Sequence, residues 1–163
     1  MNLEQWIYQQ LTGDAALSSL LAKYNDLPAV FEMKAPPDDD PGWGGIQTPR
    51  IVYFVARKVD PVHKAAGQAT MTIIHEESSN DTAFLIESEV RRLLDGAVFR
   101  PGGETVTLKW QNTEPFENDT NDHGLKLLFD FVAWPTGASY HPDPVIALRD
   151  WSAARWNDLQ VDP

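Results

Sequence analysis

The sequence predicts an α+β fold, with a single mixed, mostly antiparallel sheet and helices packed mainly on one face. Residues 51–56 and 69–74 are two consecutive runs of apolar and β-branched side chains, as expected of neighbouring strands. Residues 81–94 then form a strongly amphipathic helix, whose apolar stripe consists of Ala83, Ile86, Val90, Leu93 and Leu94. Such a stripe needs an apolar surface to cover, so a sheet with a helix on it follows.

The N-terminal residues predict a pair of helices. One amphipathic stripe occupies residues 3–11 and is interrupted at residues 12–14, and a second continues from Ala15 to Tyr24. Asp14 is expected to cap the second helix. A short strand is expected at residues 29–34, and the prolines on both sides of it indicate an edge of the sheet.

The central strands and helix have recognisable limits. Pro49 cannot continue a strand ladder, so the first central strand is expected to begin just after it. This strand is apolar throughout, which predicts burial on both faces, whereas residues 69–74 alternate and predict one buried face. Residues 79–81 are expected to cap the helix and Gly96 to end it.

The C-terminal half predicts two more strands, at residues 105–110 and 124–134, and a last helix at residues 145–156. The predicted order is therefore α-α-β-β-β-α-β-β-α. Residues 36–49 and 111–123 are expected to form two acidic loops. The sheet is complete before residue 136, so we expect a domain at residues 1–135 and a separate C-terminal extension at residues 136–163.

The charge balance and the composition limit the classes of function. The chain of 163 residues has 24 acidic and 13 basic residues and a net charge of −11. The basic pair Arg91 and Arg92 lies on the amphipathic helix near Glu87, and the chain has no longer basic run, so sequence-specific DNA binding is disfavoured. The sequence has no cysteine, no basic start with an apolar core typical of a signal peptide, and no apolar run near the roughly 20 residues of a membrane span. We expect a protein of a cytoplasm-like compartment with no membrane partner.

No catalytic, cofactor-binding or metal-binding motif emerges, and we expect the protein not to be an enzyme. The four histidines are far apart and lack the spacing of metal ligands. Residues 38–40 are three aspartates, but the alternating ligands of a calcium loop are missing. Neither a phosphate-binding loop between a strand and a helix nor a nucleophile elbow is present.

The tryptophans indicate where the chain contacts a partner. Trp6 and Trp110 are placed to fill the core. Trp43 lies in a loop, and Trp151 and Trp156 lie in the extension. The candidate interface residues are therefore Trp43, Leu148, Trp151 and Trp156. The alternative is that the loop and the extension fold back over the sheet, so that their own chain buries these side chains.

Two segments resemble bacteriophage tail terminator proteins, also called tail completion proteins. The first is the opening Ile7-Tyr8-Gln9-Gln10-Leu11-Thr12-Gly13-Asp14-Ala15-Ala16-Leu17, and the second is Thr48-Pro49-Arg50-Ile51-Val52-Tyr53, the entry to the central strand. The order of two strands, a helix at 81–94 and a strand pair ending at Trp134 is also similar. The resemblance covers most of residues 3–134. It rests on the order of the helices and strands and on the general residue pattern rather than on an invariant motif.

The resemblance implies a structural virion protein, assembled in the host cytoplasm. Its subunits would form a hexameric ring on the head-proximal end of the tail tube, stop polymerisation of the tube and join it to the neck. The implied partners are copies of the same chain, the tail tube protein and a neck or head-completion protein, and the extension is expected to contact a neighbouring subunit or the neck. DNA would pass through the ring without specific binding, which suits a negative charge. A head-closure connector and a small ligand-binding domain with helices on a sheet remain alternatives.

Overall fold

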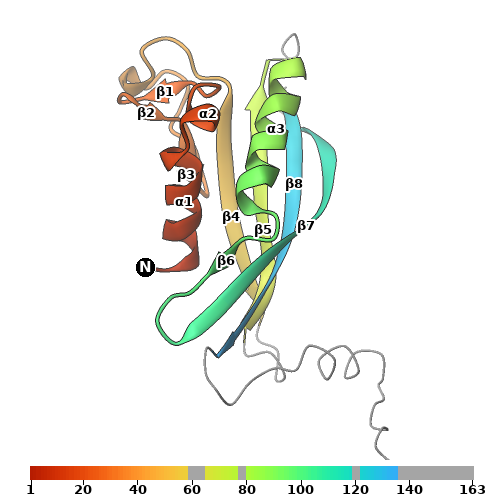
Figure 1. Ribbon diagram of the computed structural model, residues 1–163. Coiled ribbons are helices and arrows are strands. Elements are labelled where there is room, and N and C mark those ends of the chain that lie inside the picture. Colours follow the sequence, from red (N-terminus) through yellow and green to blue (C-terminus); the bar gives the residue numbers. More distant parts are fainter. Residues whose placement is uncertain (59–64, 77–79, 119–121, 136–163) are drawn as a thin grey trace, which may run out of the picture.

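The computed structural model describes residues 1–58, 65–76, 80–118 and 122–135. It confirms the predicted α+β class: a six-stranded sheet in the order β3-β4-β5-β8-β7-β6 is covered by helices on one face (Figure 1). The elements are α1 (Leu3–Gly13), α2 (Ala15–Ser18), β1 (Lys23–Tyr24), β2 (Leu27–Pro28), β3 (Val30–Glu32), the 3-10 helix η1 (Pro41–Trp43), β4 (Arg50–Lys58), β5 (Ala65–His75), α3 (Asn80–Leu94), β6 (Val98–Phe99), β7 (Glu104–Glu117) and β8 (His123–Pro135).

The sheet is mixed, as predicted, because one of its strand pairs is parallel. The edge strand β3 runs parallel to β4, and every other pair in the six-stranded sheet is antiparallel. The register places Ile51 of β4 beside Ile73 of β5, which in turn lies beside Leu125 of β8. These three side chains lie on the face that the helices cover.

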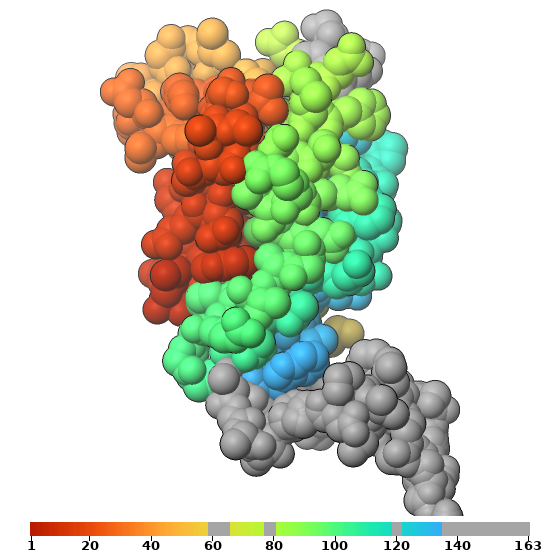
Figure 2. Space-filling model, in the orientation of Figure 1, coloured from red at the N-terminus to blue at the C-terminus, as the bar shows by residue number. Residues whose placement is uncertain are grey.

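The two main helices lie side by side over the sheet. Figure 2 shows α1 and α3 in contact along the front of the molecule, and Arg92 of α3 pairs with Asp14 at the end of α1 at 2.8 Å. The predicted stripe of α3 is confirmed, since Ala83, Ile86, Val90 and Leu94 are buried and Leu93 is half-buried. Gly96, with φ of +77°, follows the helix as expected.

The second predicted helix is much shorter than expected. The sequence predicts a helix as far as Tyr24, but α2 ends at Ser18. The chain then becomes extended, since the amide of Ala22 donates to the carbonyl of Pro49 and its carbonyl accepts from Ala29. A small hairpin, β1-β2, turns at Asn25 and Asp26, whose positive φ values suit the residues that turn a tight hairpin.

The prediction that the first central strand is buried on both faces is wrong. Ile51 and Tyr53 of β4 point into the core, whereas Phe54 is 42% exposed and Ala56 is exposed. The reason is that the helices of the described chain cover only one face of the sheet. Periodicity could not show this, because apolar residues occupy both faces of β4.

The second predicted acidic loop is mostly strand. Residues 111–117 belong to β7, which continues past a bulge between Trp110 and Asn112 and stays paired with β8 as far as Glu117. The ion pair between Glu114 and Lys126, at 3.0 Å, joins the two strands. The short β6 and the residues just before it bond to β7 only between Val106 and Trp110, so residues 111–117 form an edge of the described sheet, where polar residues and Pro115 are tolerated.

Candidate interaction surface

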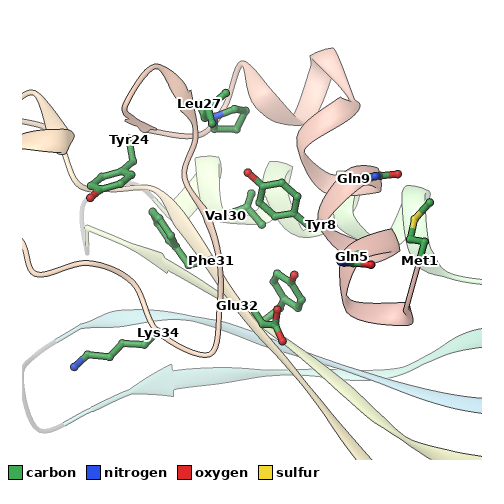
Figure 3. Close-up of a pocket in the computed structure, with 12 residues that line it drawn as sticks. Met1, Gln5, Tyr8, Gln9, Tyr24, Leu27, Val30, Phe31, Glu32 and Lys34 are labelled. Carbon is green, nitrogen blue, oxygen red and sulfur yellow. The ribbon is translucent and has the colours of Figure 1, made fainter.

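A groove runs between α1 and the edge strand β3. It is an open hollow of about 820 Å³, and Tyr8 reaches into it from α1 toward Val30 of β3 (Figure 3). Its aromatic lining consists of Tyr8, Tyr24, Phe31 and Tyr53, and its polar lining of Gln5, Gln9, Glu32 and Lys34. We call this hollow the edge groove.

The rim of the edge groove is apolar and exposed. Met1 and Leu27 line it with 63% and 57% of their surface accessible, and Met33, which follows β3, is exposed as well. Apolar side chains gathered around a hollow typically mark an interaction site.

The backbone of β3 is paired with another strand of the sheet on one side only, by β4. The carbonyl of Ala29 accepts from the amide of Ile51, and the amide of Met33 donates to the carbonyl of Tyr53. Alternation along the strand turns the peptide groups of Val30 and Glu32 away from β4, and on that side the carbonyl of Glu32 accepts from the amide of Lys34 at 2.7 Å. An open edge of this kind can pair with an added chain segment.

The floor of the edge groove is held in place by Tyr53 and Glu4. Burial raises the pKa of Tyr53, and the charges of Glu32 and Glu4 raise it further, so the hydroxyl stays protonated at neutral pH. This hydroxyl donates to the backbone carbonyl of Glu4 at 3.0 Å. The carboxylate of Glu4 pairs with Arg57 of β4, with Nη2 and Oε2 2.7 Å apart, and this hydrogen bond lowers the pKa of Glu4 despite partial burial. α1 is thereby fixed to the sheet.

Trp43 is buried by its own chain, so of the two sequence-based alternatives the loop folds back. It is only 4% exposed, and its indole N–H donates to the carbonyl of Pro37 at 2.9 Å. Its ring packs edge-on against Tyr24 and Phe31, at centroid distances of 5.2 and 5.5 Å. Trp43 therefore supports two side chains of the edge groove and needs no partner protein to be covered. Leu148, Trp151 and Trp156 lie outside the described residues, and their place at an interface stays a prediction.

The three aspartates at residues 38–40 are more than a solvated loop. Asp38 pairs with the buried Arg50 at 2.7 Å, and Arg50 also lies over the ring of Trp43 and 3.9 Å from Asp122. Asp40 accepts from the amide of Gly42 and from the hydroxyl of Tyr24. In the described part of the chain, no group of three or more histidine, aspartate or glutamate side chains is placed to hold a metal ion.

Sequence reasoning missed the edge groove and two exposed apolar residues on α3. The groove forms from segments that are distant in the sequence, so no local pattern marks it. Phe84 and Leu85, both more than half exposed, lie off the stripe that faces the core. Apolar residues outside the stripe were a signal that could have been used. Trp6 and Trp110 pack against the core only partly buried, Trp6 by stacking on Phe99.

Comparison with known proteins gives a structural likeness without a sequence family. No protein-family model and no curated protein matches the sequence. A solved chain described as "Virion of native gene transfer agent (GTA) particle" matches with a TM-score of 0.60 and 20% identity, over 80% of this chain and 93% of that chain. The two chains share a fold. A second solved chain, whose description states no function, matches with a TM-score of 0.49 and 16% identity, over 87% of this chain and 100% of that one. None of the helices in the described residues is both long enough and apolar enough to cross a membrane.

Proposed function

We propose that this chain is a structural virion protein of the tail terminator type. It assembles into a hexameric ring on the head-proximal end of a tail tube, ends polymerisation of the tube and offers the surface that joins the neck. It carries no catalytic activity in this role. The observation that supports the proposal most is the fold that it shares, over nearly the whole length of the other chain, with a component of a gene transfer agent virion.

The surface of the chain suits assembly into a closed ring. A ring requires two different surfaces on each subunit, so that one subunit's first surface meets the next subunit's second. The edge groove supplies a concave apolar surface at one edge of the sheet. The C-terminal extension, with Leu148, Trp151 and Trp156 in its sequence, supplies apolar anchors of the kind enriched at interfaces.

The charge of the chain fits a ring through which DNA passes. A net charge of −11 disfavours contact with phosphates, so DNA would not be retained in the lumen. The same charge also fits a head-closure connector, and the experiment below separates the two.

The test is to add the purified protein to tail tubes that polymerise in vitro. We expect rings at one end of each tube in electron micrographs, shorter tubes at higher protein concentration, and a hexamer in native mass spectrometry. An unrelated acidic protein of similar size is the control. A protein that stays monomeric and never binds a tube end contradicts the proposal. Rings that form but do not bind tube ends would favour a head-closure connector. A monomer that a small molecule stabilises would favour a ligand-binding domain.

A further inference from the structure

We propose that the edge groove receives the C-terminal segment, residues 143–163, of a neighbouring copy of this chain. The inference rests on the proposed ring and names the contact that links its subunits. The argument starts from the edge groove, which combines a hollow of about 820 Å³, an apolar rim and an open strand edge. Its volume is within the range that encloses a whole small ligand, so it can bury large side chains of an inserted segment.

The chain itself carries a segment of matching chemistry. Residues 136–163 follow β8 and lie outside the described residues, and their sequence includes Leu148, Trp151 and Trp156. Burial of a large apolar side chain is favourable, and the aromatic lining of the groove, with Tyr8 and Phe31, offers faces for an indole to pack on.

The edge groove carries one exposed charge of each sign, Glu32 and Lys34, and the segment carries two arginines and four aspartates, so a specific pairing of charges can orient it. Glu32 is exposed at the edge groove, and its charge raises the pKa of the neighbouring Tyr53. In the segment, Arg149 follows Leu148 and Arg155 precedes Trp156, so each outer anchor has an arginine beside it. An anchor placed in the groove brings a guanidinium toward Glu32, and opposite charges at this rim fix the register of the segment.

The proposed ring favours a neighbouring copy as the source of the segment. The segment follows β8 after residues 136–142, and two strands, β5 and β4, lie between β8 and the groove at β3. An exchange of arms between subunits also joins two different surfaces, as a ring requires, whereas insertion into the subunit's own groove would join nothing.

The absence of cysteine makes disulfide trapping a clean test. Leu27→Cys at the groove rim and Ser152→Cys beside Trp151 are combined in one full-length chain, which is then concentrated and mildly oxidised. We expect a ladder of covalent oligomers on a non-reducing gel, lost on reduction, forming about tenfold or more faster than in the control because docking raises the effective concentration. The control combines Ser152→Cys with Phe84→Cys, a position on α3 that is as exposed as Leu27 (59% against 57%).

Two results overturn the inference: a ladder that forms no faster than in the control, and a monomer in which both thiols have been consumed. A charge exchange gives an independent check. Glu32→Arg alone should slow the ladder, and Glu32→Arg combined with Arg155→Glu should restore it. A double variant no faster than Glu32→Arg argues against the pairing of groove and segment.

The trapping assay contains no tail tubes, so its outcome is independent of the test of the proposed function. A wild-type protein that caps tubes, paired with a cysteine variant that yields no fast ladder, leaves the function standing and removes the arm exchange. A fast ladder from a protein that never caps tubes supports the arm exchange and contradicts the proposed function.

Discussion

Arg50 links the acidic loop at residues 36–49 to Asp122, just before β8, through a single guanidinium. The side chain is 6% exposed, pairs with Asp38, lies near Asp122 and covers Trp43. Its Nε is buried and has no hydrogen-bond partner among the described residues. A buried cation with one group already unsatisfied depends strongly on its remaining partners. The conformation of residues 36–49, and with it Trp43 beneath the edge groove, therefore depends on Asp38.

We predict that Asp38→Asn destabilises the protein by roughly 1 kcal/mol, a value kept small because Asp38 is itself largely exposed. The amide keeps the shape of the side chain but leaves the guanidinium without its closest countercharge. Urea unfolding followed by tryptophan fluorescence measures the change. Asp39→Asn is the matched control, since Asp39 is exposed and adjacent. Equal stability of the two variants would contradict the role given to Asp38.

A second residue-scale prediction concerns Val90, which is fully buried in the middle of α3. Val90→Asp places an unpaired carboxylate in the core, which should consume much of the roughly 5–15 kcal/mol that stabilises a typical domain. We expect loss of the cooperative thermal transition in circular dichroism. Ser88→Asp, on the exposed face of the same helix, should melt close to the wild type. A near-normal melt for Val90→Asp would show that α3 does not pack on the sheet.

At the level of elements, the sequence predicts best where one local pattern decides the structure. The stripe of α3 follows from spacing alone, and Pro49 and Gly96 set limits because of their own backbone constraints. The predictions fail where contacts with a distant segment decide the local structure. Backbone bonds between Ala22 and Pro49 and between Ala22 and Ala29 accompany the early end of α2, and pairing with β8 makes residues 111–117 a strand.

The candidate site follows the same division. The sequence predicts Trp43 as a candidate interface residue, but the surface that covers it is formed by Tyr24, Phe31 and Arg50, which come from three separate segments. The edge groove needs α1, the β1-β2 hairpin and β3 together. No pattern within one of these elements predicts a hollow between them.

The attachment of α1 to the sheet should depend on pH. The hydrogen bond from Arg57 holds the pKa of Glu4 below its unfolded value of about 4.3. The stabilisation is therefore present above that value and is lost as the pH falls through the lower, folded pKa. We predict that Glu4→Gln lowers the melting temperature at pH 7 and that this difference from the wild type shrinks as the pH approaches 3. Glu104→Gln, at an exposed carboxylate, is the control. A difference that stays constant with pH would exclude the ion pair as its source.

At the scale of the whole molecule, the net charge of −11 predicts no measurable affinity for duplex DNA at physiological salt. Three of the basic residues that could neutralise phosphates, Arg57, Arg91 and Arg92, are already paired with carboxylates. Fluorescence anisotropy with a labelled duplex measures the affinity. Micromolar binding that weakens steeply with salt would reveal a basic surface and would speak against a passive lumen.

The last prediction separates folding from assembly. Among the residues that the structure describes, those buried in the main core lie between Leu3 and Ala133, and a chain that ends at Tyr140 keeps every one of them. We predict that this truncated protein has the far-ultraviolet circular dichroism expected of the folded sheet and helices and unfolds cooperatively, but neither forms rings nor caps tail tubes, because the segment that enters the neighbouring groove is gone. A full-length Trp151→Ala variant should show a milder form of the same defect, since one large apolar anchor contributes roughly 1.5–3 kcal/mol when buried. An unfolded truncation would make residues 141–163 part of the core, and a truncation that still caps tubes would make them dispensable for assembly.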